Sequence, residues 1–214
     1  MDYTSSEKRK IVKDDYNAIA DLYAKRYGSI DYCKSYIDKF VADLIGRDVL
    51  DVGCGAGQIT NYLTQKGFDV VGLDFSQKIL RIAKQNFPNC KFIQTDICEY
   101  KRESQVDGII TKDVLFHLPD EDLIRVLHIF KKLLKPKGSL CIIMDVLREP
   151  GEKIFIEELD GKHQIYYNCL SPEKLKALLE DAGFSIASIQ LVEANENVSA
   201  YAKSIMIFQV RNKI

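Results

Sequence analysis

The chain has 214 residues, a net charge of −1 and a hydrophobic content of 46%. These values are typical of one globular domain with a full core, and they exclude a strongly basic nucleic-acid-binding protein. No apolar run approaches the ~18 residues of a membrane span, and the six cysteines form no C-x-x-C pair. We therefore expect a cytoplasmic monomer or homodimer with reduced thiols, no metal site, and neither a nucleic acid nor a membrane as partner.

The N-terminal part of the chain is predicted to be helical. Apolar residues at helical spacing predict one or two helices over residues 9–27 and another over 32–45, which end at Gly28 and Gly46. Strands and helices then alternate. The predicted strands are 48–52, 69–73, 91–95, 108–111 and 139–146, the predicted helices are 59–66, 77–86 and 120–134, and a turn is predicted at 135–138. Apolar strands that are each followed by a helix indicate a parallel sheet covered on both faces.

The C-terminal part has a different pattern. Residues 147–170 look irregular and are rich in aromatic and charged side chains. Ser171 and Pro172 are a typical helix start, for a helix that reaches about residue 182. Two strands over 185–191 and 200–210, joined by a polar turn at 193–198, are predicted to form an antiparallel hairpin.

Three glycines follow the first predicted strand at every second position: Gly53, Gly55 and Gly57. Glycine lets the backbone turn sharply and lets a ligand approach closely, and the helix that follows offers unpaired N–H groups. The dinucleotide fingerprint G-x-G-x-x-G does not fit, because its sixth position falls on Gln58 or Thr60. This spacing disfavours a nicotinamide or flavin site.

Acidic residues end the next two predicted strands. Asp74 and Asp96 come directly after apolar strands, and Asp51 precedes the glycines. A single aspartate in such a place is more often a helix cap or a solvated charge. Because parallel strands end at one edge of the sheet, three of them together indicate a binding site there, where Asp74 could accept hydrogen bonds from a ribose.

Five segments together resemble one family. They read V-L-D-V-G-C-G-A-G at 49–57, V-G-L-D-F-S at 71–76, F-I-Q-T-D-I at 92–97, V-L-F-H-L at 114–118 and L-K-P-K-G at 134–138. Over residues 16–210 the chain resembles the class I S-adenosylmethionine-dependent methyltransferases of the group called type 11 or 12. The resemblance implies an α/β fold with a Rossmann-like seven-stranded sheet whose last strand is antiparallel. It also implies a single methyltransferase domain over 1–214, with a small N-terminal helical lid at 1–46 and a cap insertion at 147–170.

The resemblance also implies where S-adenosylmethionine binds. The glycine loop would lie along the methionine, Asp74 would hold the ribose, and Asp96 would accept from the adenine amino group. Phe75 and Ile97 would pack on the adenine, and Thr111 and Lys112 would line the sulfonium end, while lid residues would cover the amino-acid end. The implied cofactor-binding residues are Tyr16, Tyr23, Arg26, Asp51, Gly53, Cys54, Gly55, Gly57, Asp74, Phe75, Asp96, Ile97, Thr111 and Lys112.

The acceptor is expected to be a small molecule. The segment after the fourth strand reads Thr111-Lys112-Asp113-Val114 instead of the Asn/Asp-Pro-Pro-Tyr motif of amino-nucleobase methyltransferases, and the basic cluster Lys8-Arg9-Lys10 is interpreted as a solvated helix end. His117 is the candidate general base for an acceptor that arrives protonated, although a histidine here could instead cap a helix. The candidate substrate-binding residues are Asp145, His163, Tyr166 and Tyr167. Two alternatives stay open: a non-catalytic S-adenosylmethionine-binding protein and an NAD-dependent oxidoreductase.

Overall fold

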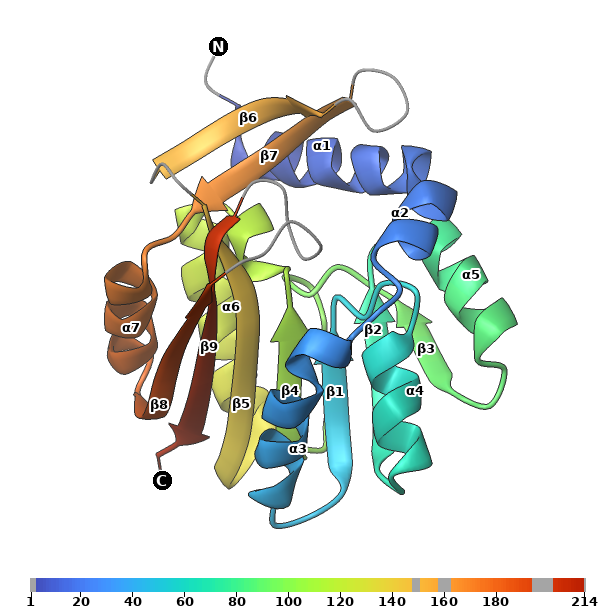
Figure 1. Cartoon of the computed structure of the whole chain (residues 1–214). Coiled ribbons are helices and arrows are strands. Elements are labelled where there is room, and N and C mark those ends of the chain that lie inside the picture. Colours follow the sequence, from blue (N-terminus) through green and yellow to red (C-terminus); the bar gives the residue numbers. More distant parts are fainter. Residues whose placement is uncertain (1–2, 148–150, 158–162, 194–201, 214) are drawn as a thin grey trace.

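A seven-stranded sheet forms the centre of the protein (Figure 1). The structure is a computed structural model that describes residues 3–147, 151–157, 163–193 and 202–213. The strand order is β3-β2-β1-β4-β5-β9-β8. The strands are β1 (Asp48–Val52), β2 (Asp69–Asp74), β3 (Lys91–Gln94), β4 (Val106–Lys112), β5 (Leu134–Leu147), β8 (Phe184–Glu193) and β9 (Ala202–Asn212). Strands β1 to β5 are parallel, and β9 is antiparallel to both of its neighbours, which confirms the predicted Rossmann-like sheet.

Helices cover both faces of the sheet (Figure 1). Successive residues of a strand point to opposite faces, so a sheet buried on both sides needs apolar residues throughout. In β4, Ile109 belongs to the apolar cluster of α6 and α7, whereas Ile110 belongs to that of α3 and α4. These helices are α3 (Lys34–Ala42), α4 (Gln58–Gln65), α6 (Asp120–Leu133) and α7 (Pro172–Asp181), and α5 (Gln77–Asn86) packs on β3.

A second layer lies across the carboxyl ends of the parallel strands (Figure 1). It consists of α1 (Ser5–Ala18), α2 (Ala20–Arg26) and the antiparallel hairpin of β6 (Gly151–Glu157) and β7 (His163–Cys169), which packs on α1. A capping box starts α1: the Thr4 hydroxyl accepts from the Glu7 N–H, and the Glu7 carboxylate accepts from the Thr4 N–H. These bonds lower the pKa of Glu7.

The expectation that residues 147–170 are irregular is wrong, because β6 and β7 form a hairpin there. In β7, Ile165 and Tyr166 are both buried although they point to opposite faces. Covering both faces hides the alternation of apolar and polar residues that normally indicates a strand.

Two other boundaries differ from the prediction. The helix predicted over 32–45 begins with a 3-10 turn, Asp31–Cys33, and α3 then ends at Ala42. Gly46 therefore ends no helix; it lies against Asp107, whose Oδ2 would be 2.3 Å from a Cβ at position 46. The turn predicted at 135–138 is an irregularity inside β5, where Lys137 has a φ of 65°.

The remaining predicted elements agree with the structure within a few residues. The turn predicted at 193–198 falls largely on residues 194–201, which lie outside the described residues. None of the described helices is both long enough and apolar enough to cross a lipid bilayer.

Candidate active site

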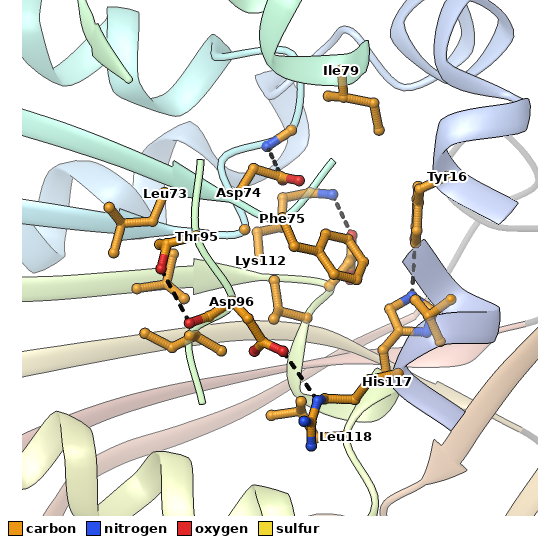
Figure 2. Close-up of a pocket in the computed structure, with 18 of the residues that line it drawn as sticks. Tyr16, Leu73, Asp74, Phe75, Ile79, Thr95, Asp96, Lys112, His117 and Leu118 are labelled. Atoms are coloured by element: carbon orange, nitrogen blue, oxygen red, sulfur yellow. Dashed lines mark hydrogen bonds and ion pairs between the residues drawn. The ribbon is translucent and has the colours of Figure 1, made fainter. Parts of the chain in front are cut away.

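A cavity opens between the carboxyl ends of β1, β2 and β4 and the helices α1 and α2 (Figure 2). Its walls leave about 720 Å³ of empty space, part of it open solvent. Most of the residues that sequence reasoning assigned to one site meet here. Those that line the cavity are Tyr16, Tyr23, Gly53, Gly55, Asp74, Phe75, Asp96, Ile97, Lys112 and His117.

The glycine loop has a shape that other residues could not adopt. Gly53 and Gly55 have φ angles of 70° and 54°, in the left-handed region that favours glycine. A Cβ on Gly53 would lie 2.0 Å from Cγ2 of Val114. The N–H groups of Gly53 and Cys54 both donate to the carbonyl of Leu73, which fixes the loop to the end of β2.

Asp74 connects the glycine loop to the start of α5. Its Oδ2 accepts from the Gly55 N–H at 3.0 Å (Figure 2). Its Oδ1 accepts from the Ser76 N–H at 2.9 Å. Burial raises the pKa of Asp74 to about 6. Burial also raises the pKa of Asp51 to about 7, although the Thr60 hydroxyl donates to it at 2.6 Å. Hydroxyl donors or a cation in the cavity would favour the ionised form of Asp74, which lines it.

Asp96 is held by a residue of α1 that sequence reasoning placed elsewhere. Its Oδ1 accepts from the Cys98 N–H at 2.9 Å, and its Oδ2 accepts from Nε of Arg9 at 3.1 Å. The guanidinium of Arg9 also pairs with the buried Asp122. Interpreting Lys8-Arg9-Lys10 as a solvated helix end is therefore wrong for Arg9, whose side chain is 17% exposed.

The spacing of Arg9 from Val12 and Tyr16 could have identified it as a site residue. Arg9, Val12 and Tyr16 lie three and four residues apart, so they share one face of α1, and all three line the cavity. Of the other two basic residues, Lys8 pairs with Glu152 of β6, and Lys10 pairs with Asp14 on the exposed side.

His117 lies between α1 and the β7 strand. Its Nδ1 is 3.0 Å from the backbone oxygen of Tyr166, and its Nε2 is 2.9 Å from the hydroxyl of Tyr16. A carbonyl only accepts, so we assign the proton to Nδ1, which leaves Nε2 to accept from Tyr16. Burial lowers the pKa of His117 to about 4, so the ring is neutral at pH 7. The ring of Tyr167 packs beside it, with the centroids 4.9 Å apart.

Replacing His117 by glutamine should remove part of the acid sensitivity of the fold. The folded-state pKa lies below the ordinary value of 6.5, so the unfolded chain binds the proton more tightly. The free energy of unfolding should therefore fall as the pH drops from 6.5 to 4, by roughly 3 kcal/mol from this group. Urea unfolding at pH 7.5 and 4.5 measures the difference. His128→Gln, on the exposed side of α6, is the control, and an unchanged pH slope in His117→Gln would contradict the assignment.

The segment after β4 contributes more residues to the cavity than expected. Lys112 lines it together with Asp113 and Val114, which sequence reasoning left out. Lys112 pairs with Asp113, and its Nζ lies 5.6 Å from the ring centroid of Tyr32. No motif in the sequence marks Asp113 as a site residue.

Several predicted cofactor residues lie outside the cavity lining. Arg26 is exposed, and its guanidinium lies 5.7 Å from the ring centroid of Tyr27. Cys54 is buried against Phe92, and Gly57 is the N-cap of α4. Asp51 and Thr111 are also absent from the lining; they are 1% exposed at the ends of β1 and β4.

The predicted substrate residues also lie outside the cavity lining. Asp145 is half-buried near the carboxyl end of β5. His163 of β7 lies with Nδ1 3.7 Å from Oδ1 of Asp15. Two of them contact His117, which lines the cavity. The backbone oxygen of Tyr166 is hydrogen-bonded to the His117 ring, and the ring of Tyr167 packs beside it.

Comparison with known proteins identifies the family. The family model described as "Methyltransferase domain" matches residues 49–138. An uncharacterized methyltransferase of Synechocystis sp. is 30% identical over 169 residues, which cover 71% of this chain and 77% of that protein. The chain belongs to the class I S-adenosylmethionine-dependent methyltransferases. A "Ubiquinone biosynthesis O-methyltransferase" of Bordetella avium is 27% identical over 183 residues, 79% of this chain and 75% of that protein.

Solved structures share the fold of this methyltransferase. A 1,6-didemethyltoxoflavin-N1-methyltransferase of Burkholderia thailandensis has a TM-score of 0.77 at 17% identity, and covers 100% of this chain and 92% of its own. The magnesium protoporphyrin IX methyltransferase of Synechocystis has a TM-score of 0.72 at 22% identity, and covers 96% and 97%. The protein is an enzyme that uses S-adenosylmethionine as its cofactor.

The cavity fits that cofactor. Gly53 and Gly55 line the cavity without side chains, so a ligand can approach the backbone of the loop closely. The carboxylates of Asp74 and Asp96 face it as acceptors (Figure 2). Oδ1 of Asp113 is buried and has no hydrogen-bond partner among the described residues, so it too is available to a ligand.

Proposed function

We propose that this methyltransferase transfers a methyl group to a small molecule bound between the cavity floor and the layer of α1 and β6–β7. The observation that carries the proposal is the arrangement of one cavity, with Asp74 and Asp96 on one side and the Tyr16–His117 hydrogen bond on the other (Figure 2). The names of two relatives support it, since ubiquinone biosynthesis and didemethyltoxoflavin both involve small-molecule acceptors.

The cofactor residues take the following roles in this proposal. Asp74 accepts from the ribose hydroxyls, while Phe75 and Ile97 pack against the adenine. Asp96 accepts from the adenine amino group, which requires Arg9 to share or release its Oδ2. The glycine loop lies along the methionine, with Asp51 below it. Support comes from the lining of the cavity, which includes the proposed adenine and ribose residues but not Asp51.

In this proposal, the substrate group that receives the methyl displaces the Tyr16 hydroxyl and donates a hydrogen bond to Nε2 of His117. When bound, the cofactor supplies an activated methyl group on a sulfonium, so transfer is an in-line displacement. The unprotonated Nε2 can take the proton of an O–H or N–H group as that group's oxygen or nitrogen bonds to the methyl. The imidazolium formed then gives the proton to water after the product leaves. The low pKa makes His117 a weak base, so its main contribution is to orient the acceptor.

The lid (1–46) and the cap (147–170) choose the acceptor and exclude water in this proposal. α1 and β7 pack together, and the Lys8–Glu152 ion pair connects α1 to β6. Of the substrate candidates, Tyr167 has the best support because its ring touches His117. Asp145 and His163 stay predictions, as do a cytoplasmic location and a monomeric or homodimeric state.

The test uses S-adenosylmethionine with an isotopically labelled methyl group and fractionated small-molecule extracts, followed by mass spectrometry. We expect at least one labelled small molecule, together with tight binding of S-adenosylhomocysteine by calorimetry. Cofactor binding without labelling in any fraction would contradict the proposed small-molecule acceptor. Titration with NAD(H) provides the comparison for an oxidoreductase.

A further inference from the structure

Arg9 of α1 connects two carboxylates that belong to different parts of the protein. Its Nε donates to Oδ2 of Asp96 at 3.1 Å, and its Nη1 donates to Oδ2 of Asp122 in the first turn of α6. Asp96 lines the cavity, whereas Asp122 lies outside the lining and its side chain is only 1% exposed. Burial disfavours the charge of Arg9, but the hydrogen bond to Asp122 and the charges of both carboxylates raise its pKa, so the guanidinium stays a cation.

Asp122 has an oxygen that the present arrangement does not use. Its Oδ1 is buried and has no hydrogen-bond partner among the described residues, although Nη1 of Arg125 lies 3.4 Å away. A buried carboxylate oxygen without a donor is costly. A guanidinium can donate to both oxygens of one carboxylate through two parallel N–H groups. Asp122 could therefore hold Arg9 more strongly than it does here, provided that Arg9 leaves Asp96.

Asp96 has the opposite need, because both of its oxygens are already in use. Oδ1 accepts from the Cys98 N–H, and Oδ2 accepts from Arg9. The adenine amino group of the proposed placement therefore meets an oxygen that already serves a cation, and a charged donor is the stronger competitor. Arg9 cannot leave for solvent without abandoning the buried charge of Asp122. Cofactor binding is favoured only if Arg9 finds a second acceptor within reach of its present position.

We propose that Asp122 is a positioning residue that takes Arg9 from Asp96 when the cofactor binds. Arg9 then donates to both oxygens of Asp122, and Oδ2 of Asp96 accepts from the adenine amino group. The exchange satisfies the unused oxygen of Asp122, keeps α1 attached to α6, and leaves no buried charge unpaired. Because Asp122 does not line the cavity, it acts on the cofactor only through Arg9. This inference rests on the proposed placement of the adenine at Asp96.

Calorimetry with two probes tests the exchange. The probes are S-adenosylhomocysteine and its analogue with hydrogen in place of the adenine amino group. Asp122→Asn leaves Asp96 as the anion that holds Arg9, so we expect affinity for S-adenosylhomocysteine to fall about tenfold. Affinity for the analogue should stay within about twofold of wild type, which also reports that the variant is folded. Arg9→Gln/Asp122→Asn removes both charges and frees Asp96, so the preference for S-adenosylhomocysteine should return to at least the wild-type ratio.

Two exposed residues of the same helix serve as controls. Glu121→Gln removes a charge next to Asp122, and Arg125→Gln removes the other nearby guanidinium; both should keep the wild-type ratio of the two affinities. The inference is overturned if Asp122→Asn keeps that ratio, if Arg125→Gln lowers it equally, or if the double variant does not recover it. If wild type binds both probes equally, the adenine placement is wrong and this inference fails with it, whereas the labelling experiment still tests methyl transfer separately.

Discussion

The Asp74→Ala variant is expected to bind S-adenosylhomocysteine at least about a hundredfold more weakly than wild type. The carboxylate accepts from the N–H groups of Gly55 and Ser76, and in the proposed site it also accepts from the ribose. Removing it deletes the ribose acceptor and frees the glycine loop from α5. Hydrogen bonds to charged groups contribute about 1.5–3 kcal/mol each, so two of them account for the expected loss.

Calorimetry measures the affinity, and two further variants serve as an intermediate case and a control. Asp74→Asn keeps one acceptor oxygen, so its affinity should fall between those of wild type and Asp74→Ala. Asp69→Ala is the matched control, because Asp69 begins the same strand at the opposite end and pairs with Lys91 at the surface. Wild-type affinity in Asp74→Ala, with the fold intact by circular dichroism, would remove Asp74 from the binding site.

The pH dependence of Asp74 has a defined sign. Burial raises its pKa to about 6 from 3.8, so the folded state binds the proton more tightly than the unfolded chain. Its contribution to the free energy of unfolding therefore falls as the pH rises from about 4 to 6. Binding runs the other way, since only the ionised carboxylate offers all its lone pairs to the ribose and the loop.

The Gly53→Ala variant is expected to lose about 3–5 kcal/mol of folding free energy. Alanine at a φ of 70° is strained, and its Cβ would lie 2.0 Å from Cγ2 of Val114. The buried loop cannot move away, because the Gly53 N–H is bonded to the carbonyl of Leu73. Urea unfolding measures the loss.

The clash and the strain can be separated. Gly53→Ala/Val114→Ala removes the clashing methyl and should recover part of the stability relative to the sum of the two single changes. Gly151→Ala is the control for strain alone, since its φ is 108° and no heavy atom lies within 4 Å of its Cβ position. Equal losses for Gly53→Ala and Gly151→Ala would show that close packing at the loop contributes nothing.

The predictable part of the fold lies where local sequence and tertiary structure agree. The strand predicted at 48–52 and the helix predicted at 77–86 match β1 and α5 residue for residue. The strand is a short apolar run that ends at the glycine loop, and the helix follows a Ser76 hydroxyl that accepts from the Ile79 N–H. Because parallel strands end together, the meeting of Asp74 and Asp96 at one cavity was also predictable.

The rest depends on contacts between distant residues. Arg9 meets Asp96 and Asp122 across 87 and 113 positions of the chain, and no local pattern specifies those pairs. Asp113 carries a positive φ that its residue type alone does not indicate. The β6–β7 hairpin lies outside the main sheet and packs on α1. Its order of apolar and polar residues therefore depends on contact with a distant helix, which the local sequence does not indicate.

The way α1 is attached has a consequence for turnover. Its buried residues are only Val12 and Asp15. By contrast, α6 buries six residues, of which five are leucine, valine or phenylalanine and the sixth is Asp122. Other contacts of α1 with the protein are ion pairs and hydrogen bonds made by Lys8, Arg9 and Tyr16. A segment held this way opens by local unfolding at a small fraction of the global free energy. We therefore expect product exchange to proceed by detachment of α1, at a rate that rises with ionic strength, while the sheet stays folded.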